Sequence, residues 1–246
     1  MTDHLEPLRA ESDRFAAAIS GADPGARVPS CPDWDLRELV AHLGRVQRFW
    51  AGVIERGEDV EPQDPDESLR PAEGEDLVTW FRAGADDLLA AVAAAPPDRP
   101  AWTWWEAPRV AGAIARHQVQ EAAVHRWDAE VASGRPGTPL DPDAAADALD
   151  EFIHITVVEH HRWTPWPGGS GVVELAPTDV AATRWVALGD GGPVPATAAP
   201  GAPDATLAGT ASDLLLLLYR RIPLGGVTAG GNRALATAFV DWLVVE

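Results

Sequence analysis

Apolar residues recur every three or four positions over long stretches of the first half of the chain, as they do on one face of an α-helix. The pattern predicts four helices, over residues 3–20, 36–55, 75–95 and 109–133. The second has a clear start signal, because Asp35 can cap it and Glu38 completes a capping-box pattern. Helices of these lengths predict an all-α four-helix bundle, a fold that commonly builds metal sites from facing side chains.

The pattern changes after residue 138, where shorter segments alternate with Gly and Pro. A helix is predicted over residues 142–163, and Thr210 can cap a leucine-rich helix over 211–221 that precedes a last helix over 233–243. Strands are predicted at 171–176, 183–188, 204–208 and 226–229, with a turn at 230–232. We therefore expect a bundle domain over residues 1–138 and a smaller α+β domain over residues 139–246.

Composition narrows the class of protein. No apolar run approaches the roughly 20 residues that span a bilayer, and the N-terminus lacks the basic and apolar parts of a signal peptide, so we expect a cytoplasmic protein without a membrane span. The net charge is −19, and all 19 basic residues are arginine. A surface with this net charge repels phosphate backbones, which argues against nucleic-acid binding.

The single cysteine, Cys31, excludes an internal disulfide and a Cys-rich zinc site. Any metal must be held by His, Asp or Glu.

The predicted helix over residues 109–133 carries ionisable side chains on its apolar face. Glu121 and His125 are four residues apart, so they lie one above the other on the same side of the helix. A lone buried carboxylate is costly, and a metal ion is one of the few good partners for it. The spacing leaves a second interpretation open, in which His117, Glu121 and His125 form a solvated or hydrogen-bonded groove edge.

Two further features have alternative interpretations. The cluster of Trp102, Trp104 and Trp105 can wall a pocket or fill the space beneath a loop. Asp128 lies one turn beyond the His–Glu pair, where it can orient an imidazole or pair with Arg126.

Three segments together resemble the mycothiol-dependent maleylpyruvate isomerase family, part of the DinB-like superfamily. They are CPDWDLRELVAH over residues 31–42, EAAVHRWDAE over 121–130 and GTASDLLLLLYRR over 209–221. The third is similar to the family's C-terminal domain, which resembles sterol carrier proteins. The resemblance spans nearly the whole chain and implies a DinB-like four-helix bundle followed by a sterol-carrier-like α+β domain.

The resemblance also implies which residues act. The family's metal ligands map onto His42, Glu121 and His125, and its functional arginine maps onto Arg221 or its neighbour Arg220, of which we prefer Arg221 as the catalytic and thiol-binding residue. The tandem arginines depart from the Gly-Arg that is usual in the family. The implied cofactors are a divalent metal, zinc above all, and mycothiol or a similar low-molecular-weight thiol.

The function implied is that of a metal-dependent isomerase or thiol S-transferase. Two imidazoles and one carboxylate leave an open position on zinc, at which a thiol binds as the nucleophilic thiolate and attacks an electrophilic, unsaturated carboxylic substrate. His117, one turn before Glu121, stands where relatives more often have Arg, and can add a metal contact or tune substrate choice. A metal-dependent hydrolase and a non-catalytic module that binds an apolar ligand stay open as alternatives, as do the monomer and the homodimer.

Overall fold

The computed structural model describes residues 4–57 and 68–244. The chain divides into two compact units, residues 1–138 and residues 139–246. The first is helical and the second contains a mixed sheet with helices, so the predicted fold class, a helical bundle followed by an α+β domain, is confirmed. Within the described ranges, no helix is long and apolar enough to cross a membrane.

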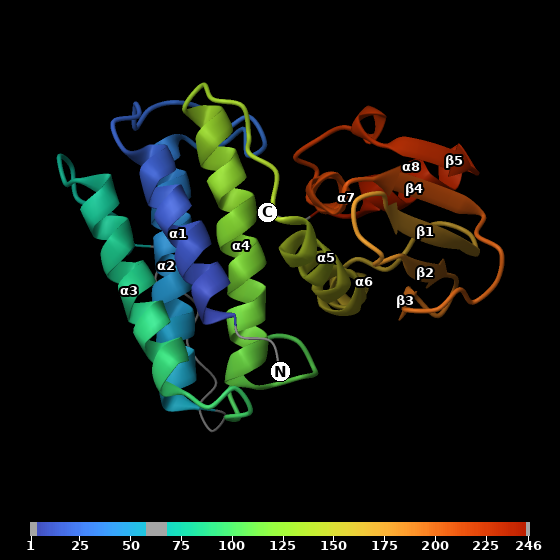
Figure 1. Cartoon of the computed structure of the whole chain (residues 1–246), viewed down its shortest axis with the longest axis horizontal. Helices are drawn as coiled ribbons and strands as arrows, with labels where there is room; N and C mark the ends of the chain where they lie inside the picture. The colour runs from blue at the N-terminus through green and yellow to red at the C-terminus, as the bar shows by residue number, and fades with distance from the viewer. Residues whose placement is uncertain (1–3, 58–67, 245–246) are drawn as a thin grey trace. The chain divides into compact units, whose positions relative to one another are not determined.

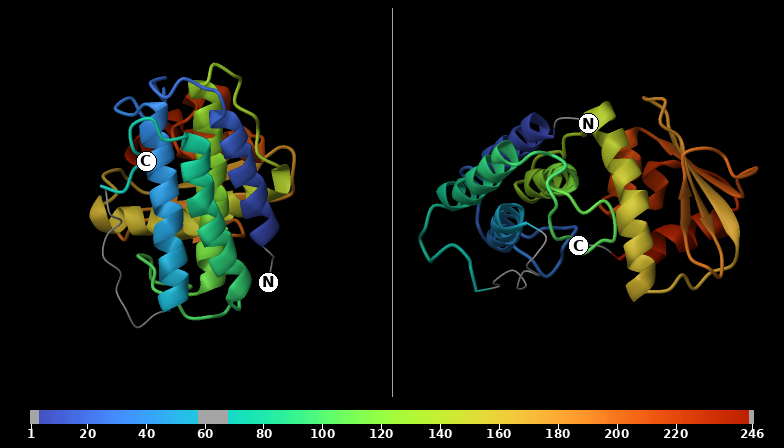
Figure 2. Two further views of the ribbon diagram at one scale, coloured as in Figure 1. Left: turned by 90° about the vertical axis from the view of Figure 1, so that its left-hand side faces the viewer. Right: turned by 90° about the horizontal axis from the view of Figure 1, so that it is seen from below.

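Four long helices run side by side in the N-terminal unit (Figure 1). They are α1 Leu5–Ile19, α2 Leu36–Arg56, α3 Leu77–Ala94 and α4 Ala111–Ala132. Helix α2 packs mainly against α3, and α1 against α4 (Figure 2, left). Their apolar faces meet in one core, whose fully buried residues include Phe15, Leu39, Leu43 and Phe81. Each such side chain contributes roughly 1.5–3 kcal/mol by leaving water.

Helix α2 begins at the capping box that the sequence predicts. The Asp35 carboxylate accepts a hydrogen bond from the backbone N–H of Glu38, the Glu38 carboxylate accepts one from the backbone N–H of Asp35, and both are 2.9 Å long. The pair satisfies N–H groups that have no partner within the helix. It fixes the first turn of α2, and thereby the position of His42 about two turns later.

Helices α2 and α3 approach closely just beyond His42. A side chain at Gly44 would collide with the indole of Trp80, so glycine is needed there. The guanidinium of Arg48 lies 4.2 Å from the centroid of the same ring and donates to the backbone carbonyls of Gly44 and Trp80. These contacts hold the middle of α2 against α3.

A fully buried arginine joins α4 to α1. The Nε atom of Arg126 donates to Glu11 at 2.8 Å, and its Nη1 atom donates to Glu130 at 3.0 Å and to the carbonyl of Thr138 at 2.6 Å. Two carboxylates offset the cost of burying the guanidinium, and they tie α4 in place one residue beyond His125. Arg126 therefore does not pair with Asp128, which was one of the two predicted roles of that carboxylate.

The C-terminal unit opens with helices α5 Pro142–Glu151 and α6 Val157–Trp163, joined by a π-helical turn, Phe152–Thr156. A five-stranded sheet of order β3-β2-β1-β4-β5 follows, in which β1 and β4 are parallel and the other neighbours are antiparallel. Its strands are β1 Gly171–Pro177, β2 Arg184–Leu188, β3 Val194–Ala196, β4 Ala205–Gly209 and β5 Thr228–Gly231. Helices α7 Ala211–Leu218 and α8 Arg233–Trp242 cover one face of the sheet (Figure 2, right).

In this unit one local prediction was wrong and one short strand was missed. The strand predicted at 226–229 is β5, which extends to Gly231, so the expected turn at Gly230 and Gly231 is part of the strand. Strand β3 was not predicted, because its three residues are too few for an alternating pattern.

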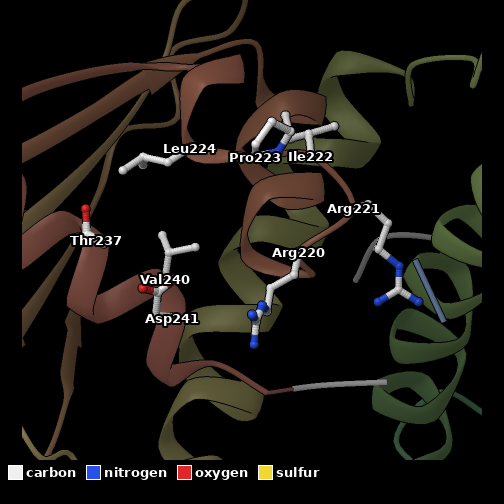
Figure 3. Close-up of a pocket in the computed structure, with 8 residues that line it drawn as sticks. All are labelled: Arg220, Arg221, Ile222, Pro223, Leu224, Thr237, Val240 and Asp241. Carbon is white, nitrogen blue, oxygen red and sulfur yellow. The ribbon is translucent and has the colours of Figure 1, made fainter. Parts of the chain in front are cut away.

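The leucine-rich helix α7 ends at Leu218 rather than at Arg221 as predicted. The N–H of Arg220 bonds to the carbonyl of Leu217 and the N–H of Arg221 to that of Leu216, which is the Schellman arrangement of a helix end. Arg220 has φ of 60°, the left-handed conformation that glycine usually adopts at this position. The side chains of Arg220 and Arg221 consequently diverge (Figure 3).

Candidate metal centre

Helices α2 and α4 bring His42, Glu121 and His125 together. The Nε2 atom of His42 lies 3.2 Å from Oε1 of Glu121, and the Nε2 atom of His125 lies 3.4 Å from the same oxygen. One ligand atom from each residue lies within 4.8 Å of the other two. Donor atoms around a tetrahedral zinc, with bonds of about 2.0–2.1 Å, are roughly 3.3 Å apart. The three side chains could therefore hold a divalent cation, and three protein ligands leave one position of a tetrahedral ion for a further ligand.

The protonation of the three groups follows from their surroundings. Burial lowers the pKa of His42, and the nearby charges of His125 and Arg45 act in the same direction, so this imidazole is neutral near pH 7. Burial alone would raise the pKa of Glu121, but the charge of His125 and the hydrogen bonds from both imidazoles hold it well below its ordinary value. Burial would also lower the pKa of His125, but the charge of Glu121 and the bond to Asp128 raise it to about 9.

Asp128 holds the second ring nitrogen of His125. The distance from Nδ1 of His125 to Oδ2 of Asp128 is 2.9 Å, and both side chains are almost fully buried. The other oxygen of Asp128 accepts a 2.6 Å hydrogen bond from the hydroxyl of Ser30. Asp128 thus directs Nε2 of His125 toward Glu121, an arrangement typical of metal-binding histidines.

An indole covers one side of the candidate metal centre. The ring of Trp34 lies 4.7 Å from that of His42 and 6.2 Å from that of His125, measured between centroids. Cys31, three residues earlier, is partly buried and is not among the residues whose ligand atoms converge. Trp34 packs against the ring of His42, whose side chain stays 20% exposed, and lies near the ring of His125.

His117 lies one turn before Glu121 but is not part of this group of converging ligand atoms. Its ring packs against those of Trp50, Trp104 and Trp105, with centroids 5.3–6.4 Å away, and its Nδ1 atom lies 3.2 Å from the amide of Gln120. Trp105 is 2% exposed and donates to the carbonyl of Pro108. Trp105 therefore fills space beside His117, whereas Trp104 is 39% exposed, and both interpretations of the tryptophan cluster stay predictions.

The C-terminal unit holds the two candidate arginines beside a pocket of about 400 Å³ (Figure 3). The guanidinium of Arg221 donates to the carbonyl of Tyr219 at 2.9 Å and lies 5.7 Å from the centroid of its ring. Arg220 is exposed. The lining residues are Arg220, Arg221, Ile222, Pro223, Leu224, Thr237, Val240 and Asp241.

Sequence reasoning missed two polar residues of the N-terminal site. Ser30 donates to Asp128 from 98 positions away, and no local spacing rule connects them. Arg45 lies three residues after His42, and its positive charge acts on that imidazole. The i, i+3 spacing was a signal for Arg45, since residues at that separation share a helix face.

Two family models match successive parts of the chain. The model of the mycothiol maleylpyruvate isomerase N-terminal domain matches residues 5–130, and the model of the C-terminal domain of the same protein matches residues 143–238. A comparison with curated proteins finds no match.

Solved structures show the same fold. A crystal structure of the mycothiol-dependent maleylpyruvate isomerase has a TM-score of 0.56 at 16% identity, and one of its histidine-to-alanine variants has 0.57 at 15% identity. Each comparison covers 92% of this chain and 91% of the other. Together with the two domain models, which span most of the sequence, these findings show that the chain belongs to the mycothiol-dependent maleylpyruvate isomerase family of enzymes.

Proposed function

We propose that this protein is a metal- and thiol-dependent isomerase that converts a cis-unsaturated carboxylic acid of the maleylpyruvate type to its trans isomer. The observation that carries the proposal is the convergence of His42, Glu121 and His125, with ligand atoms within 4.8 Å of one another, in a chain of this family. Zinc suits two imidazoles and one carboxylate, and the thiol is mycothiol or a similar small thiol.

Each residue of the N-terminal site has a role in this proposal. His42, Glu121 and His125 hold the cation, and Asp128 keeps Nδ1 of His125 protonated so that Nε2 stays available. When bound, the cation favours the thiolate form of the thiol, which is the nucleophile. Trp34 packs against His42 and helps to fix the orientation of that imidazole.

The proposed reaction needs no net change in the thiol. Sulfur adds to one alkene carbon while the π electrons move onto the activating carbonyl group. The former double bond is then single and rotates. The electrons return, the carbon–sulfur bond breaks, and the trans acid and the original thiolate are released.

We assign Arg221, rather than Arg220, as the residue that binds a carboxylate or the developing negative charge. Arg220 occupies the left-handed position that favours glycine, so it stands where the family's Gly-Arg pair has its glycine, and Arg221 stands where the arginine is. The bond from Arg221 to the carbonyl of Tyr219 orients its guanidinium, which suits a planar carboxylate.

The test combines activity with metal content. The zinc-loaded protein, the variant His125→Ala and the control His154→Ala are incubated with maleylpyruvate, with and without mycothiol. His154 is an exposed histidine outside the candidate metal centre. We expect mycothiol-dependent formation of the trans acid by the parent and the control, and loss of both bound metal and isomerisation in His125→Ala.

Other outcomes would identify a different activity. Hydrolysis of an added ester or amide without thiol would indicate a metal-dependent hydrolase. Accumulation of a stable thiol adduct would indicate a transferase. Unchanged isomerisation in His125→Ala would contradict the proposed role of the metal.

A further inference from the structure

A small polar pocket opens directly beside His42. Its volume is about 110 Å³, and it lies within the N-terminal unit. The lining residues are Trp34, Glu38, Ala41, His42, Arg45 and Arg70. The pocket is large enough to accommodate a carboxylate group.

Arg45 is a cation without a counter-charge in the part of the chain that the structure describes. Its side chain is half-buried on α2 and makes no ion pair or side-chain hydrogen bond with any described residue. The next arginine on α2, Arg48, is instead fixed by Trp80 and two carbonyl groups. A half-buried guanidinium ordinarily has such partners, because removing its charge from water is costly.

The position of Arg45 is also unfavourable to a metal ion. It lies one turn from His42 on α2 and lines the same pocket, so its charge would repel a cation held by His42. A negatively charged group between the two would be attracted by both. Because the net charge of the chain is −19, a local cation favours the approach of an acidic substrate to this place.

We propose that Arg45 and Arg70 form a carboxylate-binding subsite beside His42, which holds one acid group of the substrate. Guanidinium groups bind carboxylates through paired N–H donors, so two of them can hold the group in a fixed orientation. Glu38, the acidic residue on the pocket wall, already accepts the backbone N–H of Asp35 in the capping box.

This inference rests on the proposed function, which it deepens by assigning the substrate's carboxylate a position. An acid of the maleylpyruvate type has two carboxylates, one at each end. The subsite binds one of these carboxylates, and the second carboxylate is left for another cationic group.

Maleate binding, measured by isothermal titration calorimetry, tests the subsite without catalysis. The parent, Arg45→Gln and the control Arg56→Gln are titrated in the metal-free and the zinc-loaded form. Arg56 is exposed on the same helix, outside the pocket, and its substitution changes the charge equally. We expect saturable binding to the parent in both forms, an increase in Kd of at least tenfold for Arg45→Gln in both, and no change for Arg56→Gln.

Several results would overturn the subsite. The first is that the metal-free parent does not bind maleate. The second is that the parent and Arg45→Gln bind maleate with equal affinity. The third is that maleate binds only when zinc is present. An unchanged thermal midpoint of Arg45→Gln separates lost affinity from lost folding, and Arg45→Lys, which keeps the charge but lacks the paired donors, is expected to bind with an intermediate Kd.

The measurements distinguish a failure of the subsite from a failure of the proposed function. If metal-free protein binds maleate through Arg45 but the loaded protein shows no thiol-dependent isomerisation, the subsite holds and the proposed reaction fails. If isomerisation occurs with an unchanged KM in Arg45→Gln, the reaction holds and the subsite fails.

Discussion

The Nδ1 atom of His125 lies 2.9 Å from the Oδ2 atom of Asp128, one turn further along α4, and the two side chains are almost fully buried. This contact decides which ring nitrogen of His125 faces Glu121. It also explains how a buried carboxylate is tolerated at this place, because Asp128 accepts from both His125 and Ser30. The metal site that we propose therefore depends on a residue that would not touch the metal.

Replacing Asp128 with Ala should weaken metal binding by about 10- to 100-fold, since His125 would lose the partner that orients it. Competition with a chromophoric chelator measures the affinity. Asp147→Ala, a change of the same charge in the other unit, serves as the control. An unchanged affinity in Asp128→Ala would show that the contact does not orient a ligand.

Metal binding should strengthen as the pH rises toward about 9. The raised pKa of His125 means that its imidazole is protonated below that pH in the metal-free protein, whereas a ligand imidazole must be neutral. His42 adds no proton near pH 7, because its pKa is lowered. Calorimetry in buffers of different ionisation enthalpy should show release of about one proton from the protein per metal ion at pH 7. Release of none, with an affinity independent of pH between 6 and 8, would contradict the assignment.

Arg126→Ala should destabilise the N-terminal unit by about 3–5 kcal/mol, because it removes a fully buried guanidinium that pairs with both Glu11 and Glu130. The carboxylate of Glu11 would then keep only its pair with Arg14. Urea denaturation measures the change. Arg82→Ala removes the ion pair between two half-exposed side chains, Arg82 and Asp13, and should cost less than about 1 kcal/mol. Similar losses for both variants would mean that Arg126 contributes no more than a surface pair.

Arg220→Gly should stabilise the C-terminal unit by about 0.5–1 kcal/mol. Glycine adopts the left-handed φ of 60° without the roughly 1–2 kcal/mol cost of a side chain, and part of this gain is offset by the greater freedom of glycine in the unfolded chain. Thermal denaturation measures the stability.

The assignment of Arg221 predicts that Arg220→Gly retains isomerisation activity and that Arg221→Gln loses it. The reverse pattern would favour Arg220 as the functional arginine.

Much of the N-terminal unit could be predicted because its signals are local. The capping box needs only Asp35 and Glu38, and the shared face of Glu121 and His125 follows from a spacing of four residues. His42 joins this pair from a different helix, so its proximity could be expected only from the family resemblance.

Interactions between distant segments could not be predicted. Ser30 and Asp128 are 98 residues apart, and Glu11 and Arg126 are 115 apart, so only the packing of the helices brings them together. The end of α7 was missed for another reason. Its stop signal is a backbone conformation at Arg220, a position at which no glycine marks the helix end.

The proposed activation of a thiol by the metal is tested most directly by the absorption spectrum of the cobalt(II)-substituted protein during titration with mycothiol. A thiolate that binds cobalt gives a charge-transfer band in the near ultraviolet. The account predicts a band that saturates at one thiol per cobalt ion in the parent and is absent in His125→Ala. Failure of the parent to bind cobalt, or bound cobalt whose spectrum does not respond to the thiol, would contradict it.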